Sequence, residues 1–122
     1  MIKLIFCLHR LPHLTPQAFS EYWWNVHAPL VRERAPVLRI ARYVQSHGIG
    51  SPLDDAMQAS RDAMPGHDGF AELWWADEAD LEFAMSDPAA LQAGAELLED
   101  ERKFIDLRRS SLTFVRERPV VG

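Results

Sequence analysis

The chain of 122 residues is 48% hydrophobic and 25% charged, and its formal net charge is -5. These values are typical of one globular domain and exclude a disordered chain. The negative charge provides no broad basic surface, so we expect neither nucleic-acid binding nor docking on an anionic membrane. No apolar run reaches the roughly 20 residues of a membrane-spanning helix. The single cysteine, Cys7, has no intramolecular partner, and we expect a cytoplasmic protein.

The first segment, Ile2–Arg10, predicts a β-strand, because it is apolar, suits extended backbone and is followed by Pro12. Alternation divides its side chains into two sets, Leu4, Phe6 and Leu8 against Ile5, Cys7 and His9. Both sets are largely apolar. We therefore expect that neither face of this strand is fully exposed to water.

A helix is predicted after Thr15, whose hydroxyl can cap free N–H groups, and Pro16, which suits the first helical position. The apolar residues that follow have helical spacing: Phe19, Tyr22, Trp23, Val26 and Leu30. Pro29 disfavours helical geometry at Ala28. We expect the helix to break or kink close to His27, with a second short helical turn in PLVRERAP.

The rest of the chain contains further strands and helices. Strands are predicted over Arg39–His47, His67–Ala76 and Ser110–Arg118. Asp77 opens one helix, and Asp87 followed by Pro88 opens another. The segment 48–66 is long for a connection without structure of its own, and DDAMQASRDAM could carry a short helix.

The resulting order, β-α-β-β-α-β, predicts a ferredoxin-like α+β fold with an antiparallel sheet, formed by residues 1–122 as a single domain. The two helices of such a fold cover one face of the sheet and leave the other bare. We expect the bare face to carry an apolar patch of Ile5, Cys7, Tyr43, Phe70 and Trp74. A homodimer in which two sheets close face to face would cover this patch.

Five segments resemble the EthD-like proteins in order and approximate spacing: MIKLIFCLHR, EYWWNVHAPLV, RYVQSH, DGFAELWWAD and DERKFIDLRRS. The family is named for a protein of bacterial ethyl tert-butyl ether degradation and belongs to the dimeric α+β barrel superfamily. The resemblance covers nearly the whole chain and implies that fold and a homodimer. Relatives in the superfamily include muconolactone-type isomerases, polyketide cyclases and quinol-type monooxygenases. The resemblance therefore also implies a small cyclic or aromatic ligand and no organic cofactor.

His27 is the strongest catalytic candidate, because a histidine at a helix end can exchange a proton near neutral pH. It also resembles the family histidine in position, at the start of HAPL. The alternative is a histidine that only caps the end of the helix.

His47 is a second catalytic candidate, and Tyr43 is a candidate for substrate binding. Alternation places both on one side of their strand together with Gln45, and we assign that side to the bare face, where it could line a cavity. The alternatives are a solvent-facing strand end for His47 and an ordinary core position for Tyr43.

Four tryptophans occur as two adjacent pairs, and each pair must send its rings in different directions. In the helix, Trp23 joins the core stripe, so Trp24 is expected on the flank with His27. In the third strand, Trp74 and Phe70 are expected to face the cavity and to bind substrate.

Glu72 lies between Phe70 and Trp74 in an apolar strand, where an unpaired charge would be costly. It is a candidate for substrate binding, and it should either pair with Arg42 or His27 or lie at the wet edge of the sheet.

No metal site is predicted. His9 and His13 are four residues apart, but Pro12 separates them at the end of a strand, so they cannot share a helix face. Cys7 is expected to be a small core side chain and not a nucleophile.

Three hypotheses follow for the function. In the first, the protein is a cofactor-independent isomerase, cyclase or oxygenase in which His27, with His47, moves a proton on a small cyclic, lactone or aromatic compound. In the second, the same cavity only binds or carries a small hydrophobic molecule and assists a monooxygenase pathway. In the third, the protein is a structural dimer with a solid core.

Overall fold

Four strands form one sheet in the computed structural model, which describes all residues 1–122. They are β1 (Ile2–Leu8), β2 (Arg42–His47), β3 (Gly69–Trp75) and β4 (Ser111–Val115), and their spatial order is β2-β3-β1-β4. All neighbouring strands are antiparallel. This arrangement confirms the predicted ferredoxin-like α+β fold.

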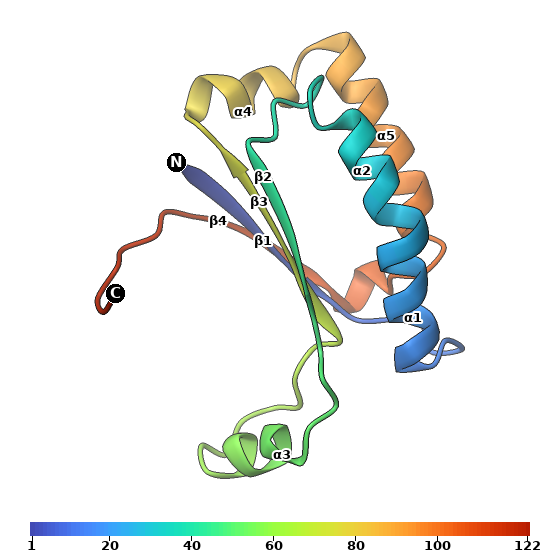
Figure 1. Cartoon of the computed structure of the whole chain (residues 1–122), viewed down its shortest axis with the longest axis vertical. Helices are drawn as coiled ribbons and strands as arrows, with labels where there is room; N and C mark the ends of the chain where they lie inside the picture. Colours follow the sequence, from blue (N-terminus) through green and yellow to red (C-terminus); the bar gives the residue numbers. More distant parts are fainter.

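Helices cover only one face of the sheet (Figure 1). Between β1 and β2 the chain forms α1 (Pro16–Tyr22), the π-helical segment η1 (Trp23–His27) and α2 (Ala28–Arg34). Between β3 and β4 it forms α4 (Glu78–Ala84), α5 (Pro88–Glu101) and the 3-10 turn η2 (Leu107–Arg109). The remaining helix, α3 (Pro52–Ala59), stands away from the rest of the chain beyond the end of the sheet (Figure 1). Every helix is too short or too polar to cross a bilayer.

The helices begin where the capping residues predict. The Thr15 hydroxyl accepts a hydrogen bond from the Ala18 N–H at 3.0 Å. The Asp77 and Asp87 carboxylates each accept a bond from the N–H three residues later, at 2.9 and 3.1 Å. These bonds satisfy N–H groups that the first helical turn leaves free. The short helix foreseen in the segment 48–66 is α3, which is capped by Ser51.

A wide turn replaces the predicted break near His27. The Ala28 N–H donates to the carbonyl of Trp23, five residues earlier, which is the bond of a π-helix. Pro29 has no N–H to donate, so the regular hydrogen-bond pattern is interrupted one residue later. The chain absorbs the interruption by widening, and α1, η1 and α2 form one continuous rod (Figure 1).

The strands are shorter than predicted. Strand β2 begins at Arg42 and not at Arg39, because Arg39 has a φ of 53° and belongs to the turn after α2. Strand β1 ends at Leu8, and Arg10 makes only an isolated bridge to Ile105.

The predicted division of β1 into two sets of side chains is confirmed. Phe6 and Leu8 are buried under the helices in one cluster with Phe19, Trp23 and Phe104. A second cluster joins the end of the sheet to α2, α4 and α5 through Val31, Leu38, Trp75, Ala84, Ala90, Ala93 and Leu97. No helix packs on the opposite face, which carries Ile5 and Cys7.

The expectation that Tyr43 lies on the bare face is wrong. Tyr43 pairs with Leu73, which in turn pairs with Leu4, and side chains of paired residues share a face of the sheet. Tyr43 therefore points toward the helices. The same register places these residues on the bare face: Lys3, Ile5, Cys7, Arg42, Val44, Phe70, Glu72 and Trp74.

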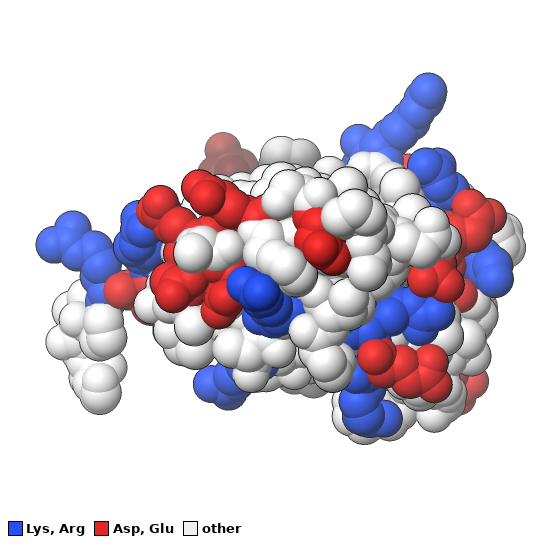
Figure 2. Space-filling model, turned by 90° about the horizontal axis from the view of Figure 1, so that it is seen from above, with Lys and Arg blue, Asp and Glu red and all other residues white.

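Charged side chains of both signs are distributed over the molecule. Seen from above, Lys and Arg side chains are interspersed with Asp and Glu, and they do not merge into a continuous basic area on this face (Figure 2). This distribution agrees with the net charge of -5.

Candidate active site

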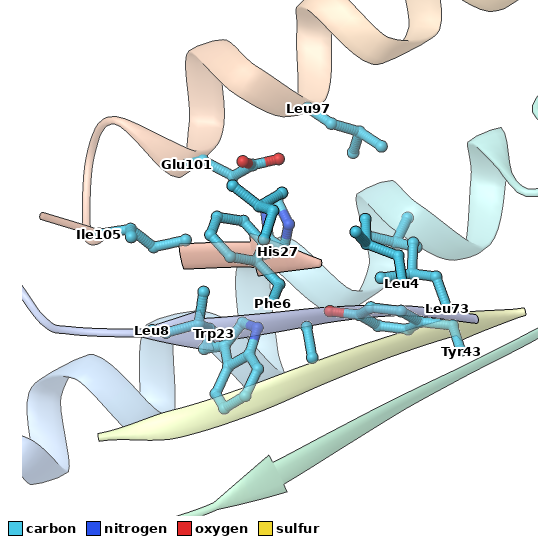
Figure 3. A pocket seen from close by; sticks show the side chains of 13 residues that line it. Leu4, Phe6, Leu8, Trp23, His27, Tyr43, Leu73, Leu97, Glu101 and Ile105 are labelled. Atoms are coloured by element: carbon cyan, nitrogen blue, oxygen red, sulfur yellow. The ribbon is translucent and has the colours of Figure 1, made fainter. Parts of the chain in front are cut away.

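An apolar cavity of about 120 Å³ lies between the sheet and the helices. All four strands contribute to its wall. Eleven of its thirteen lining residues are hydrophobic: Leu4, Phe6, Leu8, Trp23, Val31, Tyr43, Ala71, Leu73, Leu97, Ile105 and Leu112. The other two are His27 and Glu101, which approach it from the helix side (Figure 3). An apolar enclosure with a few converging polar groups is typical of a small-molecule site.

His27 is held by a buried carboxylate. Its Nδ1 lies 2.8 Å from Oδ2 of Asp100, and the two residues are only 5% and 4% exposed. Asp100 also accepts a hydrogen bond from the Tyr22 hydroxyl at 2.6 Å. Burial tends to raise the pKa of Asp100, but the hydrogen bonds from Tyr22 and His27 and the charge of Lys103 lower it below its ordinary value. Asp100 is therefore an anion at neutral pH.

The anionic partner fixes the tautomer of His27. A carboxylate can only accept, so Nδ1 carries the proton and donates it, and Nε2 keeps a free lone pair. Burial lowers the pKa of His27 more strongly than the nearby Asp100 raises it. His27 is thus a neutral imidazole at pH 7 that lines the cavity and can accept a proton at Nε2.

An aromatic cluster fixes the orientation of this pair. The Phe104 ring, fully buried, lies 5.0 Å from the His27 ring and 5.1 Å from the Tyr22 ring, between centroids. Phe19 packs against the same ring at 5.7 Å. Because these side chains are close-packed, the imidazole has little freedom to turn.

Glu101 is the second titratable group of the cavity. It follows Asp100 in α5, and its carboxylate lies near His27 and Leu97 in Figure 3. Burial raises the pKa of Glu101 to about 7, and the negative charge of Asp100 contributes in the same direction. There is therefore a pH range in which Glu101 is protonated and His27 is neutral. In this range Glu101 can act as an acid and His27 as a base.

Tyr43 places a hydroxyl on the same cavity. The side-chain amide of Gln45 donates to this hydroxyl at 2.9 Å and to the carbonyl of Trp23 at 3.0 Å. Burial raises the pKa of Tyr43, and the charge of Glu101 adds to the rise, so the hydroxyl is protonated at neutral pH. Since its oxygen already accepts a bond from Gln45, its own proton is available for a ligand.

His47 lies outside the cavity and supports it from behind. Its ring packs on the Trp23 ring with centroids 4.4 Å apart. Its Nε2 lies 2.8 Å from Oε1 of Gln45, and its Nδ1 lies 2.5 Å from the Ser20 hydroxyl. Nε2 must donate to the amide oxygen, so Nδ1 accepts from Ser20. Burial lowers the pKa of His47, which agrees with a neutral ring. This network fixes the amide that orients Tyr43.

The structure separates the other predicted substrate-binding residues from the cavity. Phe70, Glu72 and Trp74 lie on the bare face of the sheet. Neither expected partner, Arg42 or His27, pairs with Glu72. The Glu72 carboxylate instead pairs with Lys3 on the neighbouring strand, at 3.1 Å. Trp24 is 59% exposed on the outer side of the helix.

The expectation that Trp24 and His27 share one flank of the helix is wrong. Trp23 and His27, four residues apart, both point to the cavity, whereas Trp24 does not share a face with His27. Gly69 makes room for the Trp23 ring, because a Cβ atom at this position would come within 2.5 Å of it.

Asp100 and Glu101 are the residues that sequence reasoning missed. A signal was present in the apolar stripe of α5, where Ala90, Ala93 and Leu97 recur on one face. Continued by one turn, this stripe reaches positions 100 and 101 at the end of the helix. Two acidic residues at the buried end of an apolar stripe indicate a carboxylate that faces the core.

The fold is that of an α+β ferredoxin-like protein with an apolar cavity between the sheet and the helices. The EthD domain family matches residues 11–108. The chain belongs to the EthD family. No curated protein matches it.

Solved structures share the fold. An EthD family protein from Bacillus halodurans is 23% identical, with 97% of this chain and 100% of that chain covered and a TM-score of 0.61. SnoaB from Streptomyces nogalater, a cofactor-independent oxygenase, is 14% identical, with 98% and 95% covered and a TM-score of 0.57. A dimeric ferredoxin-like protein from Thermobifida fusca is 12% identical, with 93% and 88% covered and a TM-score of 0.58.

Proposed function

We propose that this EthD protein is an enzyme that moves a proton on a small cyclic, lactone or aromatic compound bound in the apolar cavity. The observation that carries the proposal is the buried pair of His27 and Asp100, which leaves Nε2 of a neutral imidazole as a base on an apolar cavity. The description of SnoaB as a cofactor-independent oxygenase supports a catalytic role for this fold.

The residues of the cavity supply each part of such a step. His27 Nε2 takes a proton from a carbon next to a carbonyl group, and the C–H electron pair forms an enolate. The Tyr43 hydroxyl donates a hydrogen bond to the enolate oxygen, where the negative charge develops. The lining around this charge is mostly apolar, so the hydrogen bond is stronger than in water.

Glu101 completes the cycle as the acid. Its carboxyl group returns a proton to a different carbon of the enolate, which yields an isomer. The imidazolium of His27 then transfers its proton to the Glu101 carboxylate, and both groups regain their starting states. The same enolate can attack a second carbonyl carbon, as in a cyclisation, or dioxygen, as in an oxygenation. All proton positions belong to the chain itself, so the proposal requires no organic cofactor.

The volume of the cavity limits the substrate. An engineered protein cavity of about 150 Å³ lined by aliphatic and aromatic side chains binds benzene. The cavity here, about 120 Å³, therefore suits a reacting part of about one ring.

A homodimer formed through the bare face of the sheet is the assembly that we propose. Phe70 is 36% exposed there, and Ile5, Cys7 and Val44 extend the apolar surface across neighbouring strands. The description of the Thermobifida fusca protein as dimeric supports this assembly. The cavity lies on the other side of the sheet, so such a dimer would leave it free.

The test is proton exchange at carbon. The protein is incubated in D2O with small lactones, cyclic ketones and hydroquinones, and deuterium uptake and product formation are measured by mass spectrometry. We expect uptake with the wild-type protein, its loss in His27→Gln, and no change in His13→Gln, which alters an exposed histidine. Full activity of His27→Gln would exclude the proposal.

A carrier function is the second candidate, and the observation that favours it is the mostly apolar lining of the cavity. A carrier would bind the same compounds without exchange or conversion, and His27→Gln would change the affinity only slightly. Conversion of a bound compound that depends on His27 excludes it.

A further inference from the structure

A second recess of about 300 Å³ lies beside the cavity, between α2 and the open edge of the sheet at β2. Val31 and Tyr43 line both spaces. The recess and the cavity are therefore neighbours that share two side chains. A ligand in the recess would lie next to the Tyr43 side chain that we assign to the reaction.

The recess contains one uncommitted cation. Seven of its ten lining residues are hydrophobic, and the polar ones are Arg32, Arg42 and Gln45. The Gln45 amide is already bound to Tyr43, Trp23 and His47. The Arg42 guanidinium lies over the Trp74 ring, 4.7 Å from its centroid, on the bare face.

Arg32 differs from its neighbour Arg34 in the same helix. Arg34 pairs with Glu33 and Glu96 and donates to the carbonyl of Leu30. Arg32 is exposed and makes no such pair within the chain, so its guanidinium is free to meet an anion.

An exposed aromatic ring lies at the other end of the recess. Trp24 is 59% exposed, although exposing so large an apolar side chain is unfavourable. Its ring meets the His47 ring edge-on, with centroids 6.2 Å apart, which holds it in place. Ala28 lies between Trp24 and Arg32 and also lines the recess, so a small side chain leaves space between ring and guanidinium.

We propose that this recess is a subsite for the carboxylate of a small aromatic acid. The carboxylate pairs with the Arg32 guanidinium and the aromatic ring contacts Trp24. The substrate of the enzyme is then a compound whose reacting part lies in the cavity and whose aromatic acid group lies in the recess. This assignment of substrate rests on the proposed function of the cavity, but binding in the recess does not require catalysis.

The test compares benzoate with benzamide, which has the same ring and no charge, by isothermal titration calorimetry. We expect the wild-type protein to bind benzoate more tightly, and added salt to weaken only benzoate. Arg32→Gln should weaken benzoate binding about tenfold or more, the effect of one charge-assisted hydrogen bond, and leave benzamide unchanged. Arg32→Lys should retain part of the preference. Trp24→Ala should weaken both ligands several-fold.

Arg61→Gln is the matched control, because Arg61 follows α3 and does not line the recess. Equal affinity of the wild-type protein for the two ligands, absence of benzoate binding, or equal benzoate affinity of Arg32→Gln and Arg61→Gln would overturn the proposal. His27→Gln should bind benzoate like the wild type. Proton exchange in His27→Gln tests the proposed function, and benzoate binding by the same variant tests the recess. The two proposals can therefore fail independently.

Discussion

His27 and Asp100 are 73 positions apart in the chain, yet their side chains form a buried hydrogen bond of 2.8 Å. One residue comes from η1 and the other from the end of α5, so the packing of two helices on the sheet builds the pair. The pair is costly to bury, and removing one partner leaves the other without compensation. This relationship leads directly to the first prediction.

Asp100→Asn should lower the rate of proton exchange by about 10²-fold or more, because a neutral amide no longer holds His27 in the tautomer with a free Nε2. Tyr22→Phe is the matched control, since it removes the other hydrogen bond to Asp100 but leaves the anion. It should reduce the free energy of unfolding by about 1 kcal/mol and retain most of the activity. Exchange rates and the tautomer, read from 15N NMR of the imidazole, check both variants. An unchanged rate in Asp100→Asn would contradict the role given to the pair.

The rate of proton exchange should depend on pH in a bell shape. His27 must be neutral to act as the base, so the rate falls on the acidic side through a pKa below 6.5. Glu101 must be protonated to act as the acid, so the rate falls on the alkaline side through about 7. Glu101→Gln should remove the alkaline fall and leave the acidic one. A profile of Glu101→Gln that still falls near pH 7 would assign the alkaline limb to another group.

Glu101→Gln should also stabilise the protein at alkaline pH. The folded protein binds a proton at Glu101 up to about pH 7, whereas the ordinary value is 4.5, so the wild type loses stability as the pH rises between these values. The loss is at most on the order of 3 kcal/mol. The variant should therefore unfold at a higher temperature than the wild type at pH 8 and show no such gain at pH 4. Circular dichroism melting curves at both pH values provide the measurement.

Gly69→Ala should destabilise the protein by about 1–3 kcal/mol, because the new Cβ would lie 2.5 Å from the Trp23 ring and 3.1 Å from the carbonyl of Ser46. Trp23 is only 1% exposed, so its ring would have to shift toward the cavity. Urea denaturation and ligand titration should show lower stability and weaker binding. Gly94→Ala is the control, since nothing lies within 4 Å of its Cβ and alanine favours the helix by about 0.5–1 kcal/mol. Similar stability of the two variants would contradict this packing.

Phe70→Arg should convert the proposed dimer to a monomer, because it replaces an exposed apolar side chain of the bare face with a charge. Light scattering after size-exclusion chromatography measures the mass. Leu91→Arg alters a side chain of α5 that is 51% exposed on the helical side, and it should leave the dimer intact. A wild-type chain that is monomeric at all concentrations would refute the assembly.

The sequence predicted the elements and the two sides of each strand, because capping and alternation are local properties. Which side of β2 faces the helices could not be predicted, because it depends on strand register and on helices far away in the chain. Both sides of β1 are apolar, so composition did not distinguish them. The expectation for Tyr43 is wrong because its face follows from the pairing of β2 with β3.

The candidate site could be predicted only in part. His27 is recognisable because Pro29 follows it closely within a helical segment. Its partner Asp100 has no local signal beyond the stripe of α5, and the raised pKa of Glu101 comes from burial in the folded chain. His47 has the neutral ring of a candidate base, but its position behind Gln45 follows from tertiary packing.

The wide turn at η1 has a consequence for the length of the chain. Its hydrogen bond spans five residues, so this turn contains one residue more than a regular helical turn. Loss of a single residue between Trp24 and Val26 would restore regular spacing but rotate α1 by about 100° relative to α2. Trp23 and Phe19 would then leave the core while His27 kept its place. The additional residue thus sets the rotation of α1, which packs into the core, relative to α2, which follows His27.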